Sequence, residues 1–157
     1  MEQAAVSYAG FWKRFIAYLI DDLVLSAAGT AVFLLIGALF GLSFLSLFRD
    51  NAESLVPLIV AAAAAIMLSI LALTIIGWMY YALMEASVTQ ATLGKMALGI
   101  KVTDLQGNRI SFGKATGRYF GKIVSVMIFY IGFIMAGFTE KKQALHDIMA
   151  GCLVVNK

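Results

Sequence analysis

Residues 10–39 of the chain read GFWKRFIAYLIDDLVLSAAGTAVFLLIGAL, and this stretch decides the class of fold. No charged residue occurs between Leu23 and Phe48. At about 1.5 Å of rise per residue, an apolar helix of this length crosses a hydrocarbon core of about 30 Å. The stretch therefore predicts a membrane-spanning helix. It carries two carboxylates, Asp21 and Asp22, roughly 13 to 15 Å beyond the interfacial Trp12, and ionisable groups inside a membrane usually mark a function.

The composition of the whole chain agrees with this prediction. Of its 157 residues, 62% are apolar and 13% are charged, whereas soluble domains have about 45–50% and about 25%. We therefore expect an all-α polytopic membrane protein with a single domain, residues 1–157. The net charge of +3 gives no reason to expect a nucleic-acid partner. Cys152 is the only cysteine, so no disulfide can form within the chain.

Two further apolar runs predict two more hydrophobic helices. Residues 54–84 contain no charged side chain and predict a second crossing at about 56–84, after an outer loop that begins near Gly41. The third run, Ile123–Phe138, is only 16 residues long and contains Gly132. It is either a short crossing or a re-entrant segment. The expected helices are therefore at about 11–40, 56–84 and 119–138, with a loop at 85–118 and a tail at 139–157.

The basic residues indicate the orientation. Half of them lie between Ser87 and Lys122, and an excess of Lys and Arg marks cytoplasmic loops. We expect the N-terminus on that side too, and a re-entrant third run would leave Arg49 as the only basic residue outside. Within the loop, residues 92–98 predict a short interfacial helix. Residues 100–103 and 109–112, joined by turn residues, predict a β-hairpin.

The first helix contains a candidate charge cluster. Arg14 and Asp21 are seven residues apart, so they share a helix face but are too far apart for a tight pair within the helix. Arg14 can reach along the groove toward Asp21, or a group from another helix can contact each of them. Tyr18 lies between the two, and its hydroxyl is a candidate bridge. Asp22 points to a different face.

Three blocks of the sequence resemble the RDD family of bacterial membrane proteins, which is named for an arginine and two aspartates. The blocks are GFWKRFIAYLID at 10–21, TLGKMALGIKV at 92–102, and ALHD at 144–147 with AGCLVV at 150–155. The resemblance implies that Arg14, Asp21 and Asp147 are the three naming residues and that Asp22 is a neighbour of this triad. The triad is either an ion- or proton-binding site or a cluster that only fastens the tail to the first helix. Asp22, Tyr18 and His146 are secondary candidates. The resemblance also implies cation/proton antiport. Cys152 stands where the family leads us to expect threonine.

Other motifs give weaker signals. Thr92–Lys95 is similar to the end of a phosphate-binding loop, but Thr89 and Met96 replace the glycine and hydroxyl residue that such a loop needs. His146 and Cys152 are too few ligands for a zinc site. No motif provides an activated nucleophile, so neither an enzyme nor a cofactor is expected.

Two functions from different classes remain open. The first is a secondary transporter, a Na⁺/H⁺ type exchanger that uses membrane-buried carboxylates and an arginine. Three helices are too few to enclose a path, so this function needs a homo-oligomer, with Gly37 and Gly41 as a candidate contact. The second is a non-transporting scaffold or accessory subunit that binds lipid headgroups or a partner protein. Either one is expected in the bacterial cytoplasmic (inner) membrane, with the lipid bilayer as its first partner.

Overall fold

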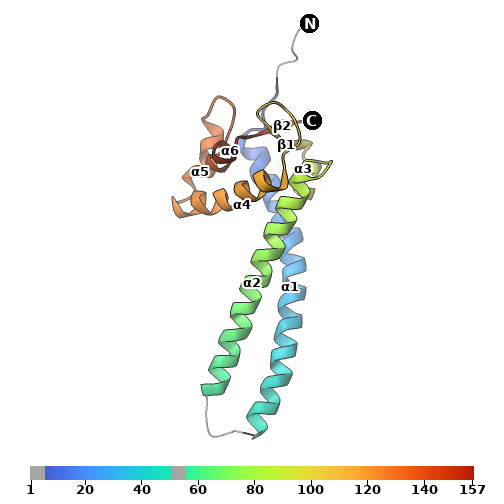
Figure 1. Ribbon diagram of the computed structural model, residues 1–157, viewed down its shortest axis with the longest axis vertical. Coiled ribbons are helices and arrows are strands. Elements are labelled where there is room, and N and C mark those ends of the chain that lie inside the picture. Colours follow the sequence, from blue (N-terminus) through green and yellow to red (C-terminus); the bar gives the residue numbers. More distant parts are fainter. Residues whose placement is uncertain (1–5, 51–55) are drawn as a thin grey trace. The chain divides into compact units, whose positions relative to one another are not determined.

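The computed structural model describes residues 6–50 and 56–157 (Figure 1). It falls into two compact units: a hairpin unit, residues 23–77, and a mixed unit, residues 6–22 and 78–157. The elements are α1 (Phe11–Asp50), α2 (Val56–Ala86), α3 (Leu93–Ala97), β1 (Ile100–Asp104), α4 (Phe112–Met127), α5 (Ile131–Ile134), the 3₁₀-helix η1 (Met135–Gly137), α6 (Leu145–Ala150) and β2 (Cys152–Asn156).

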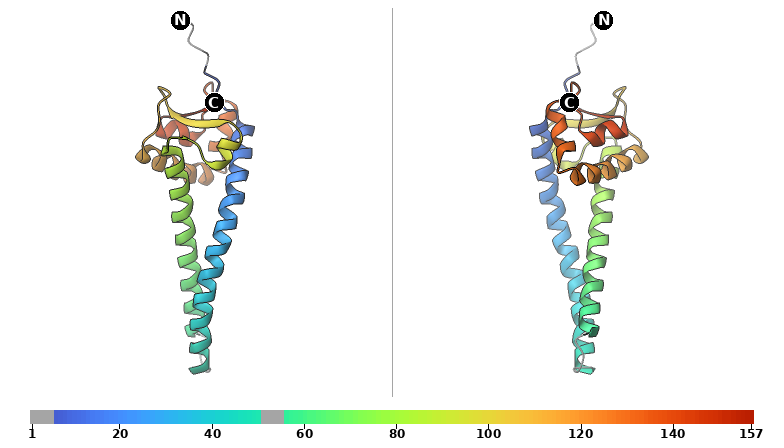
Figure 2. Two further views of the ribbon diagram at one scale, coloured as in Figure 1. Left: turned by 90° about the vertical axis from the view of Figure 1, so that its right-hand side faces the viewer. Right: turned by 90° about the vertical axis from the view of Figure 1, so that its left-hand side faces the viewer.

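In the hairpin unit, the apolar parts of α1 and α2 run side by side (Figure 2). Most of their large apolar side chains are exposed, as expected for helices whose surface contacts lipid. Serine and threonine hydroxyls in these helices donate hydrogen bonds to backbone carbonyls of the same helix. Ser69 Oγ, for example, donates to the carbonyl of Ala65 at 2.8 Å. Gly29 lets the helices approach closely, because a Cβ there would lie 3.0 Å from Leu73 Cδ2.

The prediction of two membrane-crossing helices is confirmed, since Phe11–Leu42 and Ile59–Ala86 are both long and apolar enough to cross. The predicted end of the first helix is wrong. We expected an outer loop from Gly41, but α1 continues to Asp50. A single glycine weakens a helix by only about 1 kcal/mol, which does not stop a long apolar helix from propagating. Residues 51–55 of the expected loop lie outside the described part of the chain.

A two-stranded antiparallel sheet forms the centre of the mixed unit. β1 pairs with β2, with Val102 opposite Val154 and Asp104 opposite Cys152. Residues 109–112, predicted to pair with β1, do not; Ser111 instead caps α4 by accepting a hydrogen bond from the N–H of Lys114 at 3.3 Å. β2 is apolar on both faces, so pairing with β1 buries it in the core. This burial favours β2 over the more polar residues 109–112 as the partner of β1.

The first described residues of the chain extend this sheet. Tyr8 forms an isolated bridge with Val155, and the N–H of Ala9 donates to the carbonyl of Val154 at 2.9 Å. The core of the unit consists of residues from both ends of the chain and from the loop: Ala9, Ala17, Ala82, Ile100, Val102, Ile110, Ala115, Cys152 and Val154.

These pairings determine the course of the chain through the membrane. The residues before α1, the loop after α2 and the tail are hydrogen-bonded to one another, so they lie on the same side. α1 therefore crosses and α2 returns. The segment from α4 to η1 starts and ends within the mixed unit, and it bends by 117° between Met127 and Ile131. A bend of this kind occurs in a re-entrant segment or in a broken crossing, so both alternatives for the third apolar run remain open.

In α4 the distribution of apolar and polar residues is the reverse of that in a helix of a soluble protein. Its buried residues are small or charged: Ala115, Arg118, Gly121 and Ser125. Its exposed residues include Phe120, Ile123 and Met127. The buried glycine fits against α6, because a Cβ at Gly121 would lie 3.1 Å from His146 Cβ. An apolar outer face with a polar inner face fits a helix that lies against lipid.

Candidate functional site

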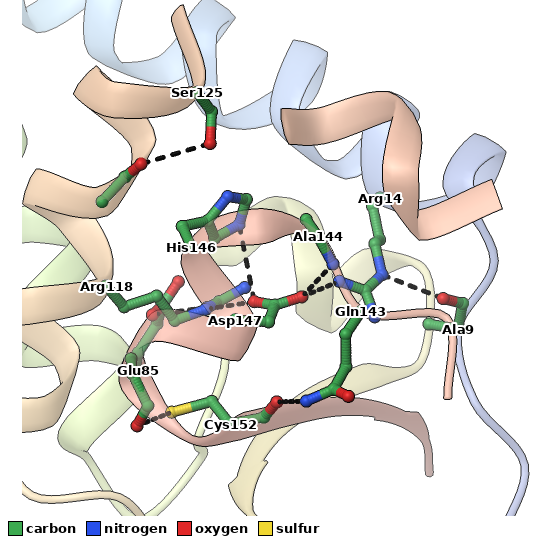
Figure 3. A network of polar contacts seen from close by, with 12 residues as sticks. Ala9, Arg14, Glu85, Arg118, Ser125, Gln143, Ala144, His146, Asp147 and Cys152 are labelled. Atoms are coloured by element: carbon green, nitrogen blue, oxygen red, sulfur yellow. Dashed lines mark hydrogen bonds and ion pairs between the residues drawn. The ribbon is translucent and has the colours of Figure 1, made fainter. Parts of the chain in front are cut away.

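The mixed unit contains a buried network of ion pairs centred on Asp147 (Figure 3). Asp147 Oδ1 accepts a 2.7 Å hydrogen bond from Nε of Arg118. Its Oδ2 accepts one from Nη1 of Arg14 and one from the N–H of Ala144, the latter at 3.1 Å. Arg14 also donates through Nε to the carbonyl of Ala9 at 2.9 Å. One carboxylate therefore joins α1, α4 and α6 and fixes the entry of the chain into α1.

A second carboxylate, Glu85 near the end of α2, extends this network. Arg118 Nη1 donates to Glu85 Oε2 at 2.7 Å, so this guanidinium bridges both carboxylates. Lys95 of α3 pairs with Glu85 Oε1. We call Arg14, Glu85, Lys95, Arg118 and Asp147 the ion-pair network.

The charges of the network determine its protonation. Burial by itself would raise the pKa of Asp147, but the guanidinium groups of Arg118 and Arg14 outweigh burial and hold that pKa well below its usual range. Burial lowers the pKa of Lys95, and the Glu85 carboxylate offsets part of this effect. Asp147 is therefore ionised at physiological pH and pairs with two arginines.

His146 is next to the network but is not charged. Burial lowers its pKa to about 3, so the ring is neutral at physiological pH. Its Nε2 lies 3.5 Å from Asp147 Oδ1, while its Nδ1 is buried with no hydrogen-bond partner. The ring packs on Phe133, with 5.2 Å between the ring centroids. This environment favours a packing role.

Asp21 occupies a separate site, also in the mixed unit, and is only 1% exposed. Its Oδ1 accepts hydrogen bonds from the hydroxyl of Tyr80 at 2.8 Å and from the N–H of Gly94 at 2.7 Å. Its Oδ2 accepts one from the hydroxyl of Thr92 at 2.5 Å. All three donors are neutral. We call Asp21, Tyr80, Thr92 and Gly94 the Asp21 site.

Gly94 is required for this close approach. A Cβ at Gly94 would overlap the backbone carbonyl of Ala17, one turn before Asp21 on α1. The start of α3 can therefore lie directly on α1 only with glycine at this position. The loop that carries Thr92 and Gly94 therefore covers the Asp21 carboxylate.

A comparison with protein families now identifies the chain. The model of the RDD family matches residues 8–151. The chain belongs to the RDD family. The resemblance of its three sequence blocks is thereby confirmed, and the matched range includes both the ion-pair network and the Asp21 site.

Two proteins of Bacillus subtilis (strain 168) are similar to this RDD protein. One, "Uncharacterized protein YxaI", is 42% identical over 95% of this chain and 97% of its own length. The other, "Uncharacterized membrane protein YteJ", is 34% identical over 96% of this chain and 82% of its own length. No solved structure matches the chain. Together with the two crossing helices, the family and the second relative make this a membrane protein.

The structure divides the three residues that the resemblance to the RDD family indicated. Arg14 and Asp147 form an ion pair, whereas Asp21 lies in its own site with neutral donors. Tyr18 is half exposed, and Tyr80, not Tyr18, provides the phenol that binds Asp21. Asp22 is exposed. Of the alternatives for Arg14, the structure shows the one in which a group from another helix contacts it.

Sequence reasoning did not identify Glu85, Lys95, Arg118, Thr92 or Tyr80 as site residues. Lys95 and Arg118 were counted among the basic residues of the loop. A usable signal is the spacing of Ala115, Arg118, Gly121 and Ser125, which places an arginine among small residues on one helix face. Within residues 6–50 and 56–157, no three His, Cys, Asp or Glu side chains converge as metal ligands do.

Proposed function

We propose that this RDD protein is a secondary transporter that exchanges protons for a monovalent cation, with Na⁺ as the first candidate, and that Asp21 is its ion-carrying group. The supporting observation is the surroundings of Asp21: a buried carboxylate on a crossing helix whose three hydrogen-bond donors are all neutral. A carboxylate without a fixed counter-charge can be neutralised by an ion, as an ion-carrying group must be.

The ion-pair network has a different role in this proposal. Asp147 and Glu85 each contact two cationic side chains, and Arg118 is common to both. Carboxylates with two such partners stay ionised through a transport cycle, because neutralising one would leave buried arginines without an anion. The ion-pair network therefore holds the mixed unit together. Asp147 stabilises this unit and does not carry the ion.

Transport needs a path, and two crossing helices do not enclose one, so the proposal includes a homo-oligomer. The hairpin unit has an apolar groove lined in part by Gly37, Gly41, Ala61 and Ala65. At both glycines an added Cβ would meet no atom within 4 Å. Small residues in an open groove suit the close approach of a helix from a second copy.

We place the mixed unit on the cytoplasmic side of the bacterial inner membrane. Of the basic residues, only Arg49 lies between the two crossing helices, and all the others belong to the segments that share a side with the sheet. An excess of Lys and Arg marks the cytoplasmic side.

A second candidate function is a non-transporting scaffold that binds lipid. The apolar outer face of α4, with Phe120, Ile123 and Met127 exposed, favours it. In this case Asp21 would only fasten α3 to α1, and no ion would move.

Exchange measured in liposomes separates the two functions. Purified protein is reconstituted, and proton movement driven by a Na⁺, K⁺ or Li⁺ gradient is followed for the wild type, Asp21→Asn and the matched control Asp22→Asn. Each variant is first compared with the wild type by size-exclusion chromatography and crosslinking. Exchange that is lost only in a correctly assembled Asp21→Asn protein supports the transporter. A wild type without exchange for any of the three cations supports the scaffold.

A further inference from the structure

The Asp21 carboxylate can accept more hydrogen bonds than the three it receives. The two oxygens of a carboxylate offer about four lone-pair positions. Oδ1 already accepts from the Gly94 N–H at 2.7 Å and from the Tyr80 hydroxyl at 2.8 Å, so both of its positions are used. Oδ2 accepts from the Thr92 hydroxyl at 2.5 Å. Any ion that arrives must therefore bind at Oδ2.

The three donors differ in whether they can also accept a hydrogen bond. The Gly94 N–H is a backbone donor and cannot accept a hydrogen bond. The Tyr80 oxygen accepts a hydrogen bond from the N–H of Leu93 at 3.1 Å, which directs its own hydrogen toward Asp21. The Thr92 hydroxyl can turn about its Cβ–Oγ1 bond and present a lone pair instead. Thr92 is therefore the donor of this site that can become an acceptor.

We infer that Asp21 takes up a proton and not a metal cation, that the proton binds at Oδ2, and that Thr92 is the residue that determines this specificity. The inference rests on the proposed function and specifies the ion at its site. A hydronium ion gives the proton, which forms an O–H bond at Oδ2, and a water molecule leaves. The new O–H then donates to Thr92 Oγ1, whose own hydrogen turns away from the carboxyl group. The exchanged cation uses a different site.

A metal cation does not fit the same position. Hard cations in proteins are surrounded by roughly six oxygen ligands. Asp21 offers one remaining position on Oδ2, and Thr92 Oγ1 adds one more. The groups on Oδ1 point hydrogens, not lone pairs, into the site. Because Asp21 is only 1% exposed, bulk water does not contact the carboxylate and so does not supply the missing ligands from the surface.

The other titratable groups near Asp21 are consistent with a proton site. Asp22 and Tyr18 come from the same helix, and Tyr80 and Tyr81 come from α2. Lys95, the nearest cationic residue along α3, directs its ammonium group to Glu85. No cationic side chain of the described residues forms an ion pair with Asp21, so the proton has no fixed competitor there.

Infrared difference spectroscopy on the reconstituted full-length protein tests this inference without requiring transport. On acidification we expect a carboxylic-acid C=O band that is absent in Asp21→Asn and present in Asp22→Asn. In Thr92→Val the acid loses its acceptor, so this band moves to higher wavenumber. In Thr92→Ser it stays at the wild-type position. Added Na⁺ or Li⁺ at constant pH leaves the band unchanged.

Three results would overturn the inference. The first is the absence of an Asp21-dependent band at every pH at which the protein stays folded. The second is a wild-type band position in folded Thr92→Val. The third is a loss of the acid band when Na⁺ is added at constant pH, which means competition for one site. Because the band reports binding and not flux, it can appear in a protein that shows no exchange, so failure of the proposed function is seen separately.

Discussion

Asp147 and Asp21 are both fully buried aspartates, but different groups surround them. Asp147 contacts two guanidinium groups and the start of α6. Asp21 contacts two hydroxyls and one backbone N–H. Removing one partner of a buried ion pair lowers the free energy of unfolding much more than removing one partner of a neutral hydrogen bond. At the scale of residues, the two sites should therefore respond differently to the same substitution.

Asp147→Asn should destabilise the protein strongly. The substitution leaves Arg14 and Arg118 buried without their common anion, which costs about 3–5 kcal/mol for a buried pair. The measurement is chemical unfolding in detergent. Asp22→Asn, at an exposed position, is the control and should unfold like the wild type. Equal stability of the two variants would contradict the structural role given to the network.

Asp147 should also make stability depend on pH. Its pKa in the folded protein lies below the ordinary value, so the unfolded chain takes up the proton first. Stability from this group is present at pH above about 4 and is lost as the pH falls through and below that value. Unfolding measured between neutral and acid pH should show the loss in the wild type. A profile equally steep in Asp147→Asn would assign the loss to other groups.

Gly94→Ala should destabilise the contact between α3 and α1. Its Cβ would overlap the carbonyl of Ala17, and overpacking of this kind costs about 1–3 kcal/mol. Gly117 is the matched control, because it lies within α4 and an added Cβ there meets no atom within 4 Å. Gly117→Ala should stabilise α4 by about 0.5–1 kcal/mol. Thermal unfolding of both variants measures the difference, and a Gly94→Ala protein as stable as Gly117→Ala would exclude the close approach.

At the scale of elements, the sequence predicts the helices well and their partners poorly. The two crossing helices follow from uncharged runs, and α3 follows from a short helical segment at 92–98. The pairing of β1 with β2 joins residues about fifty positions apart, and no local turn signal reveals it. α4 starts at Phe112, earlier than expected, because the Ser111 cap was interpreted as strand. Long-range pairing and burial, not local propensity, determine these features.

We propose that α4 and α5 re-enter the membrane without crossing it, which predicts that both ends of this segment are accessible from one side. In a background with Cys152→Ser, single cysteines replace Gln106 and Lys141. An impermeant thiol reagent applied from the side of the mixed unit should label both positions. Labelling of 106 and 141 from opposite sides would mean that the third apolar segment crosses the membrane.

At the scale of the whole molecule, the candidate site is assembled from segments that are distant in sequence. The resemblance to the RDD family identified Arg14, Asp21 and Asp147, and two of these are in contact. The sequence did not predict that Asp21 would be bound by Thr92 and Gly94, since this contact depends on a loop folding back onto α1. Such a contact separates Asp21, for which we propose ion uptake, from the ion-pair network.

The most direct test of this account is proton movement driven by a Na⁺ gradient in liposomes, expressed per folded protein, for the wild type, Asp21→Asn and Asp22→Asn. We predict exchange in the wild type and in Asp22→Asn, and at least a tenfold loss in an Asp21→Asn protein that assembles normally, about 1.4 kcal/mol or more in activation free energy. Wild-type exchange in correctly assembled Asp21→Asn would contradict the central claim that Asp21 carries the ion.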